Sequence, residues 1–364
     1  MRSLSCARAL LHTSACSRAT AKVPIALISK VRNLRPGTPL ALARTALEQS
    51  APSHDVDKAL EWIEAQAAQS GAAKAQKLAS RAANEGLVGV SVLDAGGVQS
   101  AQAAGARTST TGGARAALVE LSCETDFVAR TQEFKDCAAD IARAAAFFAD
   151  SVTVAPTEEQ AFVPVDVEAL TSAPLVPATD NAASTSTSEQ KTVGDSIAAL
   201  VARLGEKIVL RRAATVAIDP PSSSSTSSAL HVLGAYAHGG SGGEPGATFL
   251  SGTLAALLVL RVPGRRLPAD APAVVRALAR QAVALPTSSV RRQREVQNEA
   301  EGGAPSEALY EQALMTLSPK AGDDAFTFQP GQSTVAEVLE AWSQARKLEG
   351  TAAVVDVLRW EVGR

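Results

Sequence analysis

The sequence predicts an α+β protein in which a helical N-terminal module precedes a core of two related α+β subdomains. Before residue 70, apolar residues recur three or four positions apart, which is typical of short amphipathic helices. Further along, alternating patterns such as Ala117, Val119 and Leu121 indicate strands, and they are interspersed with helical stripes. With 364 residues the chain is long enough for two or three domains, although aromatic residues make up only 4%, so each core should be modest in size.

Residues 1–23 have the composition of a mitochondrial transit peptide. No acidic residue precedes Glu48, whereas arginine, serine and alanine are frequent. Transit peptides are rich in arginine and serine and poor in acids, and the apolar stretch here is too short for a secretory core or a membrane span. A disordered basic tail would have a similar composition and is the alternative.

Residues 24–70 predict three short helices. The first covers 24–34, and the second covers 39–49 with Thr38 as its N-cap before a proline at the first helical position. Asp55 is the expected cap of the third helix, and Gly71 is its expected end. Three helices in so few residues form a compact bundle that resembles a ubiquitin-associated (UBA-like) domain.

The first core subdomain is predicted over residues 71–150. Strands are expected at 86–90 and 116–122, and a helical pattern through Phe134 and Ile141 follows. The octapeptide Cys-Glu-Thr-Asp-Phe-Val-Ala-Arg at 123–130 therefore occupies a strand-to-helix turn, which is a usual place for functional residues.

The second core subdomain is predicted over residues 192–364, after a low-complexity insertion at 151–191. Thr192 and Thr334 begin capping boxes, and the helix that starts at Thr192 should end at Gly205. The remaining expected elements are strands at 208–216, 231–236, 254–262 and 354–362 and a helix at 274–282, with a Ser-rich insertion at 220–228 and a Gly-rich loop at 239–246.

Composition and motifs argue against several function classes. The net charge of −2 gives no global field for a nucleic acid, so we expect no nucleic-acid partner. The chain lacks a phosphate-binding loop of the Gly-x-x-x-x-Gly-Lys-Ser/Thr type, so no direct nucleotide binding and no cofactor are expected, and no segment is apolar enough for a membrane span. Neither the cysteines (Cys6, Cys16, Cys123, Cys137) nor the histidines (His12, His54, His231, His238) have the spacing of a metal site or a catalytic pair.

Spacing alone leaves the role of the octapeptide open. Phe127 could be a core residue and Asp126 a helix cap, or both could be exposed for a partner. His238 at a predicted hairpin end has the same ambiguity, since such a residue is often simply half-buried.

The octapeptide resembles the signature of the elongation factor Ts family. Further segments resemble that family in the same order: 199–208 followed by Arg211 and Arg212, then 232–239, then 358–363. The serine-rich insertions and the long glycine-rich loop are unlike compact bacterial members. Because the chain ends at Arg364, we also do not expect the C-terminal helix of some bacterial relatives.

The resemblance implies a guanine-nucleotide exchange factor without bond chemistry of its own, acting on mitochondrial elongation factor Tu in the mitochondrial matrix. In the family, the aromatic residue of the signature intrudes between helices of the GTPase and disturbs its Mg²⁺ site. The residues expected to bind the partner are Thr125, Asp126, Phe127, Val128, Arg130, His238 and Gly239. The alternative is a ubiquitin- or polypeptide-binding protein that acts through the UBA-like module.

Overall fold

The computed structural model describes residues 23–35, 38–50, 53–96, 114–149, 160–176, 191–219, 229–240, 248–291, 306–319, 323 and 325–364, with the backbone alone at 68–75. It divides into two units, Met1–Gln69 and Ser70–Arg364. The transit segment (except Val23), the Ser-rich insertion and most of the Gly-rich loop lie outside the described residues.

The first unit contains the predicted helices. They are α1 (Ile25–Leu34), α2 (Leu40–Gln49) and the beginning of α3 (Val56–Leu78), and their apolar faces enclose Val31, Leu47 and Ala59. Asp55 accepts a hydrogen bond from the backbone N–H of Asp57, as a cap should.

Two expected helix boundaries in this region were wrong. The Thr38 hydroxyl donates to the Arg35 carbonyl, and Pro39 occupies the N-cap position of α2 without a side-chain cap. Helix α3 continues through Gly71 to Leu78, because alanine, glutamine and lysine around the glycine are strong helix formers that outweigh its cost of about 1 kcal/mol.

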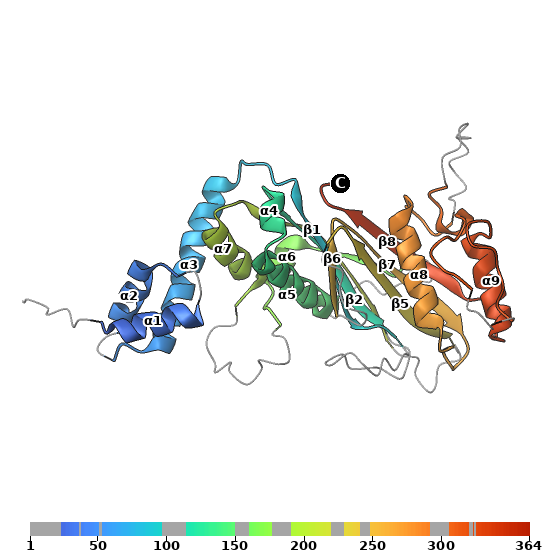
Figure 1. The fold of residues 1–364 in the computed structure, drawn as a ribbon, viewed down its shortest axis with the longest axis horizontal. Coiled ribbons are helices and arrows are strands. Elements are labelled where there is room, and N and C mark those ends of the chain that lie inside the picture. Colours follow the sequence, from blue (N-terminus) through green and yellow to red (C-terminus); the bar gives the residue numbers. More distant parts are fainter. Residues whose placement is uncertain are drawn as a thin grey trace, which may run out of the picture. The chain divides into compact units, whose positions relative to one another are not determined.

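The second unit is built on two antiparallel sheets (Figure 1). Sheet one has the spatial order β3 (Val163–Val165), β4 (Ile208–Ile218), β2 (Ala114–Cys123), β1 (Glu85–Asp94) and β6 (Phe249–Gly252). Sheet two has the order β5 (Ala229–His238), β7 (Leu254–Pro263) and β8 (Ala353–Glu361). The mixture of helices with antiparallel sheets confirms the predicted α+β class.

Four layers make up this unit. The two sheets face each other across a core that includes Val90, Leu118 and Leu257. Helix α5 (Gln132–Phe148) covers the outer face of sheet one, and α8 (Ala271–Ala284) covers the outer face of sheet two. The close approach of α8 requires a glycine in β5, since a Cβ atom on Gly234 would lie 2.4 Å from the carbonyl oxygen of Val275.

The chain crosses between the sheets more often than its linear pattern indicates. Strand β6 pairs with β1 in sheet one, although its sequence neighbours β5 and β7 pair with each other in sheet two. Sheet one thus combines strands from both predicted core subdomains, and the boundary between these subdomains stays a prediction. The predicted insertion at 151–191 also contains β3 and α6 (Val167–Ser172), which are too short to show a period in the sequence.

Helices α7 (Val193–Leu204) and α9 (Val335–Ala345) begin where the sequence predicts, whereas α8 begins three residues before the predicted start at residue 274. In α7 and α9, the capping boxes that start at Thr192 and Thr334 are complete, and Gly205 ends α7 in the left-handed conformation. No helix among the described residues is long and apolar enough to cross a membrane. In the same part of the chain, no group of three or more His, Cys, Asp or Glu residues is arranged to hold a metal ion.

Candidate partner-binding site

The octapeptide forms a short, well-defined turn between a strand and a helix. Strand β2 ends at Cys123, one helical turn α4 (Asp126–Ala129) follows, and α5 begins at Gln132. Each helix has a threonine cap: Thr125 Oγ1 accepts from the N–H of Val128, and Thr131 Oγ1 accepts from the N–H of Phe134. The backbone of the turn is therefore fixed by its own sequence.

Phe127 points into solvent and is not part of a core. Its side chain is 79% exposed, whereas Val128 next to it is 8% exposed and Phe134 is fully buried. The core alternative for Phe127 is therefore wrong. Asp126 is not the cap either, because it lies in the first turn of α4 and forms an ion pair of 2.9 Å with Arg130.

Glu206, which follows α7, holds the turn through Thr125. One carboxylate oxygen accepts the backbone N–H of Thr125 at 3.1 Å, and the other accepts the Thr125 hydroxyl at 2.7 Å. Both donors of Thr125 are thus bound by a residue 81 positions later in the chain. The same hydroxyl oxygen caps α4, so the carboxylate fixes the start of the helical turn that carries Phe127.

Glu124 joins the turn to two further segments. Its carboxylate accepts the Lys207 backbone N–H at 2.7 Å and pairs with Arg81 at 3.3 Å. These contacts, the Lys207 hydrogen bond first, lower the pKa of Glu124 below its ordinary value. The Lys207 ammonium in turn donates to the carbonyls of Ala79 and Arg81, so the segment between α3 and β1 and the segment after α7 brace the turn together.

Cys123 lies beneath the turn as a buried, protonated thiol. Its Sγ donates to the Thr125 carbonyl at 3.1 Å. Burial first, and then the charge of Glu206, raises the pKa of the Cys123 thiol to about 12. A thiol in this state is a poor nucleophile, which agrees with a structural role.

His238 and Gly239 lie at the same end of sheet one as the octapeptide. His238 ends β5 and is exposed, and Gly239 follows it with a φ of 76°, a left-handed conformation that favours glycine. Both segments can be located along β1. The His238 carbonyl packs on Gly252 of β6, which pairs with Val88 of β1. Cys123, where the octapeptide begins, pairs with Glu85 of the same strand. Glu85 and Val88 are three positions apart, so the two segments are offset by about 10 Å along the direction of β1.

Arg211 and Arg212, which belong to a segment that resembles the family, are structural. Arg212 pairs at 2.6 Å with Glu120, a fully buried carboxylate of β2, and its guanidinium lies over the Trp360 ring. Arg211 approaches the same carboxylate at 3.5 Å. Neither Glu120 nor Glu206 was predicted as a site residue, because their partners are distant in sequence. The only signal for Glu206 was its place in the segment 199–208.

Comparison with known proteins gives a consistent result. The family model described as Elongation factor TS matches residues 124–301, beginning inside the octapeptide. The mitochondrial elongation factor Ts of Mycosarcoma maydis is 36% identical, over 94% of this chain and 85% of that protein. Those of Malassezia globosa and Coprinopsis cinerea are each 35% identical and cover 98% and 95% of this chain and 93% of their own lengths.

The chain belongs to the elongation factor Ts family. Its relatives carry mitochondrial names, and the protein is a mitochondrial member, as the composition of residues 1–23 predicts. The family resemblance of the octapeptide and the later segments is therefore confirmed, while the roles of the individual site residues stay predictions.

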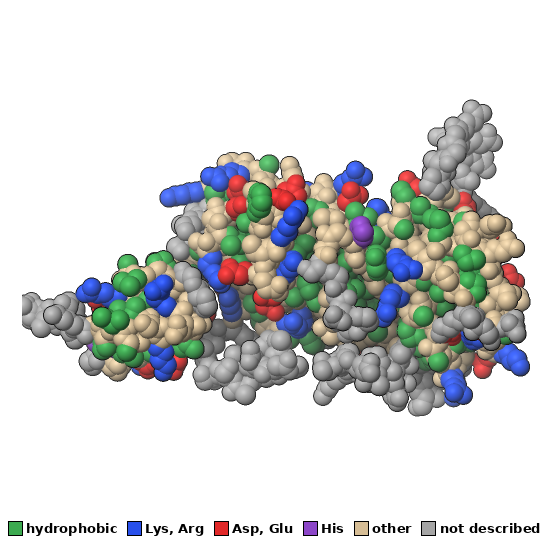
Figure 2. All heavy atoms as spheres, in the orientation of Figure 1, with side chains coloured by type: hydrophobic (Ala, Val, Ile, Leu, Met, Phe, Trp, Pro, Cys, Tyr) green, Lys and Arg blue, Asp and Glu red, His purple; other side chains and the backbone are tan. Residues whose placement is uncertain are grey.

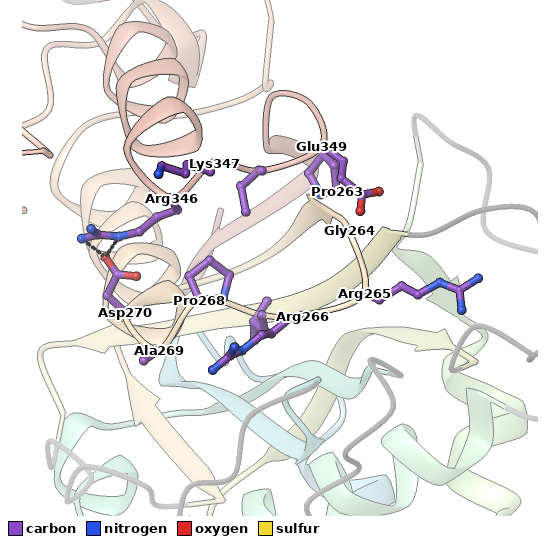
Figure 3. A pocket seen from close by; sticks show the side chains of 12 residues that line it. Pro263, Gly264, Arg265, Arg266, Pro268, Ala269, Asp270, Arg346, Lys347 and Glu349 are labelled. Atoms are coloured by element: carbon purple, nitrogen blue, oxygen red, sulfur yellow. Dashed lines mark hydrogen bonds and ion pairs between the residues drawn. The ribbon is translucent and has the colours of Figure 1, made fainter.

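The chain also has a pocket of about 760 Å³ away from the octapeptide (Figure 3). It lies between the turn that follows β7 and the turn that follows α9, and none of the predicted site residues lines it. On one wall Arg346 binds Asp270 and Asp323, and Asp270 also accepts from the Trp342 indole N–H. The Arg346 ion pairs thus hold the end of α9 against the start of α8.

Proposed function

We propose that the protein promotes GDP release from mitochondrial elongation factor Tu by inserting the Asp126–Phe127 turn into the GTPase. The observation that carries this proposal is the 79% exposure of Phe127 on a turn that Thr125 and Glu206 hold in place. An exposed aromatic side chain on a rigid support is typical of an interface anchor, because little conformational entropy is lost on binding.

The mechanism requires preference for one state of the partner. An exchange factor accelerates release only if it binds the nucleotide-free GTPase better than the GDP-bound form. Phosphate contacts and a Mg²⁺ ion order the switch elements of a GTPase, so a wedge that displaces those elements weakens GDP binding. The protein needs no bond chemistry of its own for this step, and GTP then binds to the vacated site.

The other predicted residues have distinct roles in this proposal. Asp126 and Arg130 offer an exposed ion pair beside Phe127, while Val128 faces the core and anchors the turn. His238 and Gly239 provide a second contact at the same end of sheet one.

The test is a labelled-GDP release assay with mitochondrial elongation factor Tu. Phe127→Ala should reduce the acceleration at limiting factor concentration by about 30-fold, which corresponds to an anchor residue worth about 2 kcal/mol. Phe147→Ala is the matched control, since Phe147 is also an exposed phenylalanine (45%) but lies near the end of α5. Wild-type release rates with Phe127→Ala would refute the wedge, and no acceleration by the wild-type protein would refute the exchange function itself.

A second candidate is polypeptide or ubiquitin recognition by the helical module. It is favoured by three exposed large apolar side chains on α1 and α2, namely Ile25, Leu34 and Leu40. Retention of the protein on immobilised ubiquitin, lost on Leu40→Ser, would support it.

A further inference from the structure

The charge of this protein is distributed very unevenly along the chain. Residues 261–294 contain eight of its 35 basic residues, all arginine, and one of its 37 acidic residues. This segment therefore carries a formal charge of +7, and the rest of the chain carries −9. The expectation of no nucleic-acid partner was based on the net charge alone, and that average conceals the segment.

Six of these arginines are described by the structure, and all six are exposed. Arg261 lies on the side of β7 that carries Leu257 and Val259 and faces sheet one, whereas the other five lie in the turn before α8, on α8 and just after it. We call these five the arginine face: Arg265, Arg266, Arg276, Arg280 and Arg291. Arg276 and Arg280 lie about 6 Å apart along the outer side of α8, since Val274, Val275 and Leu278 on its other side pack on sheet two. Figure 2 shows Lys and Arg side chains over α8 on the face in view.

Within the part of the chain that the structure describes, the arginine face is not neutralised by carboxylates, although the Arg280 guanidinium donates to the Thr316 carbonyl and that of Arg291 lies over the Tyr310 ring. No member forms an ion pair with an acidic residue among the described residues. Elsewhere eleven described arginines do form such pairs, namely Arg35, Arg44, Arg81, Arg130, Arg143, Arg203, Arg211, Arg212, Arg346, Arg359 and Arg364. Asp270, the one acidic residue of segment 261–294, pairs with Arg346, as Figure 3 shows. In the same figure Arg265 extends away from the pocket.

We propose that the arginine face binds the phosphate backbone of RNA. The guanidinium groups are spread from the turn before α8 to the segment after it, and α8 alone is about 21 Å long, which fits an extended polyanion better than a small anion. Arginine binds phosphate through two parallel hydrogen bonds, and the segment contains no lysine.

The apolar side chains around the face favour RNA over an acidic protein. None of the exposed large apolar side chains of the described residues lies within 261–291, and Met315, beside the Thr316 carbonyl that Arg280 binds, is a single one next to the face. The face therefore has few of the apolar anchors on which protein interfaces depend. It also offers no exposed aromatic side chain for base stacking, so binding should be electrostatic and independent of sequence. The face lies on the outer side of sheet two, whereas the octapeptide turn leads into α5 on the outer side of sheet one, so both contacts can form at once.

The experiment measures fluorescence anisotropy of a labelled RNA duplex of about 20 base pairs with the full-length protein, between about 50 and 200 mM salt. The expected result is micromolar binding that weakens steeply with salt. Arg266→Gln/Arg276→Gln should weaken binding about tenfold or more and reduce the slope of log K against log salt by roughly 2, because two phosphate contacts are lost. Within the described residues neither side chain forms a hydrogen bond or an ion pair, so the substitutions should leave the fold unaffected, and a thermal melt checks this.

The matched control is Arg44→Gln/Arg364→Gln, which removes two exposed arginines that are already ion-paired and should leave RNA binding unchanged. The proposal is wrong if the wild-type protein does not bind the duplex at low salt, or if the two double variants weaken binding equally. It is also wrong if polyglutamate of matched charge displaces the RNA at the same charge concentration, since the face would then suit an acidic protein. No GTPase is present in this assay, so its outcome does not depend on the exchange function.

Discussion

Replacing Glu206 with alanine should impair nucleotide exchange although Glu206 is not expected to touch the partner. The substitution removes two charge-assisted hydrogen bonds to Thr125, of 3.1 and 2.7 Å. Such bonds contribute about 1.5–3 kcal/mol each when buried, and Glu206 is half-buried, so we take about 2 kcal/mol for the pair. This corresponds to a roughly 30-fold increase in displaced conformations of the turn, so GDP release at limiting factor concentration should fall by up to about 30-fold.

A double-mutant cycle separates positioning from general damage. If Glu206 acts by orienting Phe127, then Glu206→Ala should have little further effect in a protein that already carries Phe127→Ala. Thr125→Ser keeps both donors and should remain close to wild type. Glu340→Ala, which removes an exposed glutamate that accepts from Gln344 on α9, is the matched control. An equal loss of exchange in both backgrounds, or no loss at all, would refute the reasoning.

Three further outcomes follow from the charged and buried groups. Arg346→Met should destabilise the fold by about 3 kcal/mol in urea titrations, because two half-buried aspartates lose their shared cation; an unchanged midpoint would contradict this. The pKa of Glu124 is lowered, so its contribution to stability is present at neutral pH and is lost as the pH falls through its folded-state pKa; Glu124→Gln should flatten that acid limb of the stability curve. With Cys6 and Cys16 replaced by serine, thiol reagents at pH 8 should label the native protein only as fast as it unfolds, since burial raises the pKa of Cys123 to about 12 and that of Cys137 to about 11.

The local features of the fold could be predicted from the sequence. The capping boxes at Thr192 and Thr334 and the strand-turn-helix around the octapeptide depend on residues within a few positions of one another. Errors arose where local signals competed, as at Thr38, whose hydroxyl binds a preceding carbonyl, and at Gly71, where the surrounding helix formers prevail.

The candidate site could be located from the sequence but not explained by it. The exposure of Phe127 depends on how α4 packs on sheet one, and the spacing of apolar residues does not determine this. The contact between Thr125 and Glu206 joins residues from different predicted subdomains, so neither residue has a local signal for it. The uneven distribution of arginine was present in the sequence from the start, but the net charge obscured it.

The long separation between the turn and its brace has a consequence for biosynthesis. At about 5–20 residues per second, the 81 residues between Thr125 and Glu206 take roughly 4–16 seconds to synthesise. During that interval β2 also lacks one neighbour, because β4 has not yet been made. An incomplete chain therefore carries the aromatic residue without the support that orients it, and the turn reaches its final geometry only with the second half of the molecule.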